Sequence, residues 1–432
     1  MDVGVWSFRL CILAIVQVTY LMIGGLTLVK RIDATTDPGD IEALKEVKAA
    51  VDSSTSTPFT CLGSWDFSFD PCDAKFSTHF TCGLDCDNEN PANRRVTSLA
   101  LDQSGYKGTL SPFVGNLSSL QELTISGNSF RGFVPVTLGH LSNLNKLDLS
   151  NNLFSGHIPS SLGKLMKLAY LSLSNNLLKG PIPASFRDLH HLERLSLYNN
   201  KLNGIIPSFN NLRQLRYFDA SRNDLSGKIS VDLLPSSILQ LSLRSNRLCG
   251  SLPKAFTELR ELEVLDLSYN RLVGKVDQFL FQLPLLQQLN LSHNKLTSVA
   301  VPDLSSFHSE LVAVDISYNQ LQGSLPSKFA NIKPLSALSL SYNLFSGLVP
   351  YQYALKAGIS HNGSSDEEKP LVRLLLDGNY LTGKIPAPFF RLDPEHITAS
   401  FIYNCLQSCP AKLFFCKGGG QRPLSQCRKH LS

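Results

Sequence analysis

The stretch LDLSYNRLVGK, Leu265 to Lys275, decides the fold because it places one polar amide, Asn270, in the middle of a short strand pattern. Its first two leucines point to one side of an extended chain, while Asp266 and Ser268 point to the other. The chain must then turn inward, and each backbone group buried there without a partner costs about 1–3 kcal/mol. Because an Asn side chain offers two donors and an acceptor, we expect Asn270 to satisfy this turn, which is a structural role.

The same pattern recurs along most of the chain. In the register LxxLxLxxN, Asn stands at positions 128, 152, 176, 200, 223, 246, 270, 294, 319, 343 and 379, and Ser104 takes the Asn position of a degenerate first copy. The spacing is 23 to 25 residues except for the last step, which is 36. A period of this length with this pattern is typical of a leucine-rich-repeat solenoid.

We therefore predict an α/β solenoid, a right-handed leucine-rich-repeat superhelix of about 12 repeats with a parallel concave sheet and a disulfide cap at each end. Coils stacked about 4.8 Å apart give a sheet on the order of 55 Å long, and both exposed ends need caps. The predicted parts are a signal segment at 1–34, an N-terminal helix and Cys cap at 35–95, repeats at 96–396, and a C-terminal Cys cap and basic tail at 397–432. The long last step predicts a surface loop inserted near 351–370.

The chain begins with a segment typical of a secretory signal. An uncharged apolar run, Leu10–Val29, follows Arg9, and Ala34 offers a small residue for cleavage. The run could also span a bilayer, and Lys30 and Arg31 put more positive charge behind it than in front, so an uncleaved anchor is the alternative. No second apolar run follows and the C-terminus is polar, so we expect no later transmembrane segment or lipid anchor.

The cysteines predict an oxidising compartment. Two groups of four lie near the ends of the chain: Cys61, Cys72, Cys82 and Cys86, then Cys405, Cys409, Cys416 and Cys427. This placement predicts two disulfide caps, and the absence of paired CxxC spacing argues against a zinc site. Cys11 would leave with the signal. Cys249 stands alone in the repeats, where it is either a quiet half-buried thiol or an intermolecular bridge.

The composition excludes a disordered chain, and the motifs do not favour catalysis. The chain is 43% hydrophobic and 17% charged, with a net charge of +5, so it can bury a large core. It lacks HExxH and GxSxG motifs. GNYLTGKI, Gly378 to Ile385, resembles a phosphate-binding loop, but Ile385 stands where Ser or Thr is needed. We expect no enzymatic activity, no metal, no cofactor and no nucleic-acid partner.

Four repeats follow their Asn with a pattern that resembles the plant extracellular subclass of leucine-rich repeats: SGHIP (155–159), KGPIP (179–183), NGIIP (203–207) and TGKIP (382–386). DIEALKEVKAAV (40–51), SWDFSFDPC (64–72) and FTC (80–82) resemble the amino-terminal cap of receptor kinases, receptor-like proteins and polygalacturonase-inhibiting proteins. SFIYNCLQSC (400–409) resembles the closing cap. The resemblance covers nearly all of the chain after the signal.

The resemblance implies an extracellular binding protein and a cysteine pairing. By the family pattern, Cys72 pairs with Cys82, which leaves Cys61 for Cys86. The chain departs from the family in having no Trp in DAKFSTHF, 73–80, and only 27 residues follow Cys405, which leaves no room for a kinase.

The solvent-facing strand positions predict a binding surface, because solenoids use their concave face for partners. Tyr and Arg are enriched at binding hot spots. The candidate ligand-binding residues are Arg194, Tyr198, Tyr217, Arg222, Arg244, Tyr269, His293, Tyr318 and Tyr342. The alternative is that SYN is simply a frequent spelling of this repeat.

Two further features concern modification and charge. Glycosylation sequons stand at Asn116, on the expected convex side, at Asn290, in the candidate stripe, and at Asn362, in the insertion. A glycan on Asn290 would cover part of the stripe. The tail carries Lys412, Lys417, Arg422, Arg428 and Lys429, which predicts either a solvated basic tail or electrostatic retention on a wall polyanion such as pectate.

These features lead to a functional hypothesis with two alternatives. We expect a secreted or cell-surface plant glycoprotein, in the extracellular space or cell wall, that binds a protein, peptide or saccharide in signalling or defence as co-receptor or decoy. Its partner could be a receptor kinase, and association with the plasma membrane would come through that partner or an uncleaved signal. The alternatives are an inhibitor of cell-wall-degrading hydrolases and a structural component of the wall.

Overall fold

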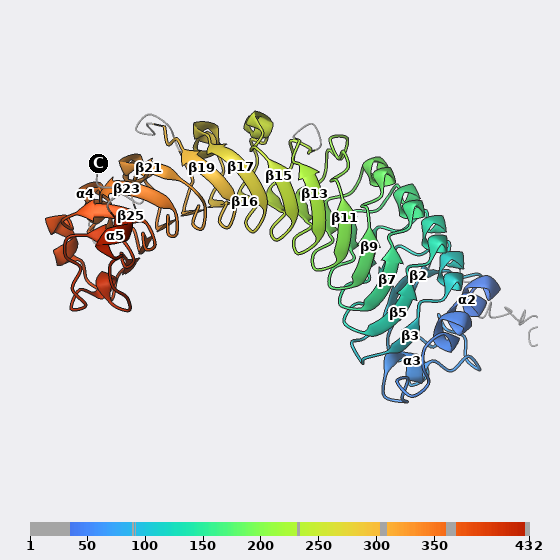
Figure 1. Ribbon diagram of the computed structural model, residues 1–432. Helices are drawn as coiled ribbons and strands as arrows, with labels where there is room; N and C mark the ends of the chain where they lie inside the picture. The colour runs from blue at the N-terminus through green and yellow to red at the C-terminus, as the bar shows by residue number, and fades with distance from the viewer. Residues whose placement is uncertain are drawn as a thin grey trace, which may run out of the picture.

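The computed structural model describes residues 35–88, 90, 92–230, 234–302, 309–359 and 369–427. The predicted signal segment, Asn362, Arg428 and Lys429 lie outside these ranges. The described chain forms one curved solenoid, with helix α2 (Pro38–Ala49) at one end and α5 (Leu424–Cys427) at the other (Figure 1). The predicted leucine-rich-repeat fold is confirmed.

The concave side of the arc is a 14-stranded sheet. β1 pairs antiparallel with β2, and each later strand adds in parallel. In β16, Leu265 is fully buried between half-buried Val264 and Asp266, so the leucines form the core face and the flanking residues form the concave surface. The strands are β1 (Leu84–Cys86), β2 (Val96–Ala100), β4 (Glu122–Thr124), β6 (Lys146–Asp148), β8 (Tyr170–Ser172), β10 (Arg194–Ser196), β12 (Tyr217–Asp219), β14 (Gln240–Ser242), β16 (Val264–Asp266), β18 (Gln288–Asn290), β20 (Ala313–Asp315), β22 (Ala337–Ser339), β24 (Arg373–Leu375) and β26 (Thr398–Ser400).

A second set of short strands follows the inward turns. One sheet of nine strands contains β3 (Lys107–Thr109), β5 (Ser129–Phe133), β7 (Leu153–His157), β9 (Leu177–Gly180), β11 (Lys201–Gly204), β13 (Asp224–Lys228), β15 (Arg247–Gly250), β17 (Arg271–Val276) and β19 (Lys295–Val299). A four-stranded sheet contains β21 (Gln322–Ser324), β23 (Leu344–Leu348), β25 (Tyr380–Gly383) and β27 (Cys405–Leu406).

The return path of most coils is a single 3-10 turn. Several begin directly after a proline, such as Pro159 and Pro183, whose fixed φ and missing N–H suit the start of a helical turn. These turns are η1 (Pro112–Asn116), η2 (Val136–His140), η3 (Ser160–Lys164), η4 (Ala184–Asp188), η6 (Lys254–Glu258), η7 (Gln278–Gln282), η8 (Ser327–Asn331), η9 (Ala387–Arg391) and η10 (Phe414–Cys416).

The Asn ladder has the geometry that the repeat predicts. Asn270 Nδ2 donates to the carbonyls of Leu243, Leu267 and Ser268 at 2.9, 3.2 and 3.2 Å, and its Oδ1 accepts from Leu248 N–H at 3.0 Å. Each ladder Asn therefore joins its own turn to the coil before it. Asn404 makes the same set of bonds 25 residues after Asn379, so it is a further ladder member that the sequence analysis missed.

The predicted pairing of the amino-terminal cysteines is wrong. The disulfides join Cys61 to Cys82 and Cys72 to Cys86, rather than Cys72 to Cys82 and Cys61 to Cys86. Cys61 begins the short helix α3 (Cys61–Ser64), and Ser64 Oγ accepts from Thr81 N–H, which brings the helix beside Cys82.

The other half of the cap explains the second bridge. The hydroxyl of Thr36 accepts from Cys72 N–H at 2.9 Å, and Thr36 pairs with Arg94, which holds Cys72 beside β1 and Cys86. With the corrected pairing, the missing Trp is also found: buried Trp65 lies between Cys61 and Cys82 in sequence and donates to the Cys82 carbonyl.

The carboxyl-terminal cysteines pair among themselves, as predicted, in the bridges Cys405–Cys427 and Cys409–Cys416. Arg422, expected in a basic tail, is instead part of the cap. Its Nε and Nη2 donate to the carbonyls of Asn379 and Gly378, and its guanidinium lies 4.3 Å from the Tyr380 ring centroid. This Arg therefore closes the last turns and is not a free cation for a wall polyanion.

The predicted insertion does not start as a loop. Its first part is the helix α4 (Tyr351–Ala357), which contacts η8 and η9 where other coils place a 3-10 turn. Tyr353 is fully buried and donates to the Pro326 carbonyl at 2.7 Å, because the helix packs its apolar face into the solenoid. Residues 360–368 lie outside the described ranges.

Candidate functional site

The residue before each ladder Asn has a left-handed backbone. Its φ lies between 52° and 56° where it is not glycine, a conformation that costs an L-residue about 1–2 kcal/mol. We call these positions the rim row: Gly127, Asn151, Asn175, Asn199, Arg222, Ser245, Tyr269, His293, Tyr318, Tyr342, Gly378 and Tyr403. Glycine and Asn tolerate this conformation best, so the run of aromatic residues at four successive positions goes against the backbone preference.

Those four aromatic residues form one continuous stack. Ring centroids are 3.8 Å apart for Tyr269 and His293, 4.1 Å for His293 and Tyr318, and 4.4 Å for Tyr318 and Tyr342. Next in the row is Gly378, where an added Cβ would lie 2.6 Å from the Tyr342 ring, so glycine leaves room for that ring. Because the rings cover one another's faces, this aromatic stack presents mainly edges and hydroxyl groups to solvent.

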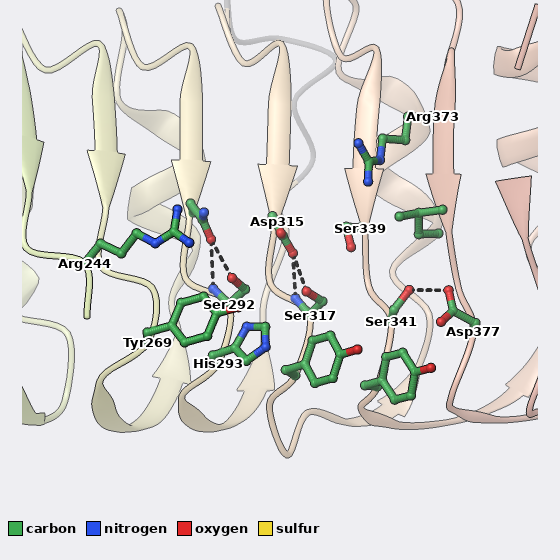
Figure 2. Close-up of a pocket in the computed structure, with 14 residues that line it drawn as sticks. Arg244, Tyr269, Ser292, His293, Asp315, Ser317, Ser339, Ser341, Arg373 and Asp377 are labelled. Atoms are coloured by element: carbon green, nitrogen blue, oxygen red, sulfur yellow. Dashed lines mark hydrogen bonds between the residues drawn. The ribbon is translucent and has the colours of Figure 1, made fainter. Parts of the chain in front are cut away.

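A groove of about 350 Å³ lies between the aromatic stack and the carboxyl ends of the concave strands (Figure 2). It adjoins a hollow of about 260 Å³ further up the sheet, with which it shares Asn290, Asp315, Ser339 and Arg373. The hollow exists because Ala313 and Ala337 are small and occupy register positions between Gln288 and Arg373.

The acidic groups of the groove are bound within the protein. Asp315 accepts from Ser317 N–H and Oγ at 3.0 and 2.6 Å, and Asp377 accepts from Ser341 Oγ at 2.7 Å (Figure 2). Asn290 accepts hydrogen bonds from Ser292 in the same way. In the sheet, Asn290 lies between Asp315 and Asp266, the carboxylate at the same position two strands earlier. A carboxylate at position 290 would put three like charges in adjacent strands, which is unfavourable.

Two nitrogen atoms that line the groove have no hydrogen-bond partner in the described part of the chain. Arg244 Nε and His293 Nδ1 are buried and have no hydrogen-bond partner among the described residues. The Arg244 guanidinium lies 5.1 Å from the ring centroid of Tyr269, which is the first ring of the aromatic stack. Within the described ranges, the Arg373 side chain forms no ion pair or hydrogen bond, and it points toward the hollow (Figure 2).

His293 has a shifted acidity that follows from its position. Burial within the stack lowers the pKa of His293, the nearby Arg244 charge lowers it further, and Asp315 opposes the shift. The neutral imidazole is therefore favoured over the cation at this place.

The structure brings together five of the nine predicted ligand-binding residues: Arg244, Tyr269, His293, Tyr318 and Tyr342. The other four lie earlier along the solenoid. Arg194 packs on Tyr217, with the guanidinium 3.8 Å from the ring centroid, and Asn175 donates to the Tyr198 hydroxyl. Arg222 occupies the rim row, separated from Tyr269 by Ser245.

Several groove residues were missed in the sequence analysis. Ala313, Ala337, Ser339, Arg373 and Asp377 shape the groove, but the row of Arg194 and Tyr217 was not followed to the later coils. Aligning the first outward position of every strand would have revealed two consecutive alanines followed by an arginine.

The other predicted positions can now be placed. Asn116 is exposed at the end of η1, and Asn290 is half-buried in the groove, while glycosylation at either stays a prediction. Cys249 is exposed rather than half-buried, because it points outward from β15. Within the described ranges, no three His, Cys, Asp or Glu residues cluster as metal ligands, and no helix is both long and apolar enough to cross a membrane.

Comparison with known proteins shows which family these repeats match. Residues 94–154, 118–178, 166–225 and 236–296 match the leucine-rich repeat family. A receptor-like protein kinase of Arabidopsis thaliana is 38% identical over 93 residues, which is 22% of this chain and 8% of the kinase.

Solved structures match over a longer range. The PEPR1–AtPEP1 structure aligns with a TM-score of 0.71 and 30% identity, covering 85% of this chain and 48% of that one. The plant peptide hormone receptor RGFR1, in complex with RGF2, aligns with a TM-score of 0.59 and 29% identity, covering 69% and 50%. The chain thus spans about half the length of these receptor chains and a small part of the kinase. The repeats, the two disulfide caps and these relatives together support a relationship of this chain to the plant extracellular leucine-rich-repeat family.

Proposed function

We propose that this chain binds a peptide or protein ligand outside the cell, and that the groove beside the aromatic stack is the binding site. One observation carries the proposal: two buried nitrogens, Arg244 Nε and His293 Nδ1, line the same groove without a partner in the described structure. An orphaned buried polar group costs about 1–3 kcal/mol, and this cost would be removed by a ligand acceptor at Arg244 Nε and, according to the imidazole tautomer, a ligand donor or acceptor at His293 Nδ1.

The rim row supports the same site. Every coil has the left-handed conformation at this position, but beside the groove four successive positions carry bulky aromatic residues in place of the Gly or Asn that tolerate it best. Tyr hydroxyl groups and Ser hydroxyl groups line the groove, with one arginine at each end, and these polar groups suit the repeating N–H and C=O groups of an extended peptide.

The relatives favour a peptide over the other ligand classes. PEPR1 is solved with AtPEP1, and RGFR1 is described as a peptide hormone receptor in complex with RGF2. We infer a role in signalling or defence, as a co-receptor or decoy secreted to the extracellular space or cell wall. Hydrolase inhibition and a structural role in the wall have no comparable support from the groove.

The test compares ligand binding by a variant in which a bulky side chain fills the groove with binding by a variant that carries the same change elsewhere on the sheet. Ser339→Trp places an indole in the groove, and Ser196→Trp places one at the same strand position in β10, outside it. We expect wild type and Ser196→Trp to capture the same peptides from plant extracellular fluid, identified by mass spectrometry, and Ser339→Trp to lose them. Equal capture by all three proteins would remove the groove as the binding site, and capture of a wall hydrolase instead would favour the inhibitor alternative.

A further inference from the structure

The charges of the groove are arranged unevenly. Of its four charged lining residues, the two carboxylates, Asp315 and Asp377, are held by serine hydroxyl groups, as described above. The two arginines, Arg244 and Arg373, have no acidic partner among the described residues. An arginine without a counter-ion in a partly buried groove is a ready site for a carboxylate or another oxyanion.

The two arginines stand at opposite ends of the groove (Figure 2). Arg244 follows β14, and Arg373 begins β24. The strand order runs β14, β16, β18, β20, β22, β24, so five strand-to-strand steps separate the two coils. At about 4.8 Å a step the two coils are about 24 Å apart. Because both arginine side chains extend into the groove toward each other (Figure 2), their guanidinium groups are closer than this, and an extended peptide joins them with at most about seven residues.

The space between the arginines fits such a peptide. The Ala313 and Ala337 methyl groups and Ser339 keep the middle of the path hollow, and the aromatic stack forms its lower wall (Figure 2). The bound carboxylate of Asp315, in the middle of the groove, disfavours acidic groups there, because a ligand anion would face it, whereas Asp377 lies on the same coil as Arg373.

We propose that the ligand is an extended peptide with two acidic groups at most about seven residues apart, one paired with Arg244 and the other with Arg373, and with no acidic residue between them. This inference rests on the proposed function, since it specifies what the groove binds. The acidic groups can be Asp or Glu side chains or, at one end, the terminal carboxylate.

The experiment selects displayed random dodecapeptides on the folded, disulfide-bonded protein, discarding binders that Ser339→Trp also retains. We expect the remaining peptides to be enriched in pairs of acidic residues at one constant separation of at most about seven residues. For a synthetic binder, replacing either acid by its amide should lower affinity about tenfold, the size of a charge-assisted hydrogen bond.

Variants of the arginines locate each contact. Arg244→Gln should lower affinity about tenfold for the parent peptide, but not for the peptide that lacks the matching acid, and Arg373→Gln should do the same for the other acid. Arg194→Gln is the matched control, because Arg194 faces the same sheet outside the groove. The urea midpoint of each variant reports folding, and Arg244→Lys keeps the charge if the amide variant proves unstable.

The outcomes separate the two proposals. Two outcomes overturn this inference and leave the groove as the site. In the first, the peptides that Ser339→Trp fails to bind contain no paired acids. In the second, these peptides bind Arg244→Gln and Arg373→Gln with the same affinity as wild type. Absence of any Ser339-dependent peptide overturns the proposed function and this inference with it.

Discussion

The Asn ladder allows the most direct calculation of a mutational effect. Asn270→Ala removes the equivalent of three hydrogen bonds. The two Nδ2 hydrogens are shared among the carbonyls of Leu243, Leu267 and Ser268, and Oδ1 accepts from Leu248 N–H. All of these groups lie in buried surroundings, where water cannot replace the amide. At about 1–1.5 kcal/mol each, we expect the free energy of unfolding to fall by about 3–5 kcal/mol.

The assay is urea unfolding followed by circular dichroism, with Asn143→Ala as the matched control. Asn143 also makes two side-chain hydrogen bonds, to Ser118 and Lys167, but in an exposed setting where water can take their place. Its loss should change stability by no more than about 0.5 kcal/mol. If Asn270→Ala costs less than about 1 kcal/mol, or no more than Asn143→Ala, then the ladder does not act by satisfying buried backbone groups.

Three further changes have defined outcomes. The pKa of His293 is lower in the folded state than its ordinary value of about 6.5. The contribution of His293 to the free energy of unfolding is therefore present above about pH 6.5 and is lost as the pH falls through the lower folded pKa. His293→Tyr should reduce the difference between the urea midpoints measured at neutral and at acidic pH. Serine at both Cys61 and Cys82 should lower stability by about 2–4 kcal/mol in thermal unfolding, and an unchanged melting temperature would show that this bridge is dispensable. If Asn290 is glycosylated, Asn290→Gln should bind the selected peptides more tightly than wild type, whereas Asn116→Gln on the convex side should bind them equally.

The fold was predictable because its determinants are local and repeated. Each coil carries its own leucines and its own Asn, so the period alone indicates the solenoid, and the bonds of Asn270 follow from the valence of its amide. The family pattern failed for the amino-terminal cysteines, since their pairing depends on where α3 docks. That docking rests on contacts between residues distant in sequence, such as Ser64 with Thr81.

The candidate site was only partly predictable. The aromatic residues were visible as a stripe, yet their left-handed backbone and face-to-face stacking appear only in three dimensions. Arg194 and Tyr217 have the same chemistry as the groove residues, but they satisfy each other. Arg373 was overlooked although it occupies the same row of the repeat as Arg194 and Tyr217, next to two strands that carry alanine in that row.

The central claim is that the ligand binds between β14 and β24, along the aromatic stack. The most direct measurement is photo-cross-linking of a selected peptide that carries a photoreactive group near its middle, followed by mass spectrometric mapping of the attachment site. We predict attachment within residues 244–377, at the groove-lining positions, and its loss in Ser339→Trp. Attachment around Arg194 and Tyr217, or on the convex side, with unchanged yield in Ser339→Trp would contradict it.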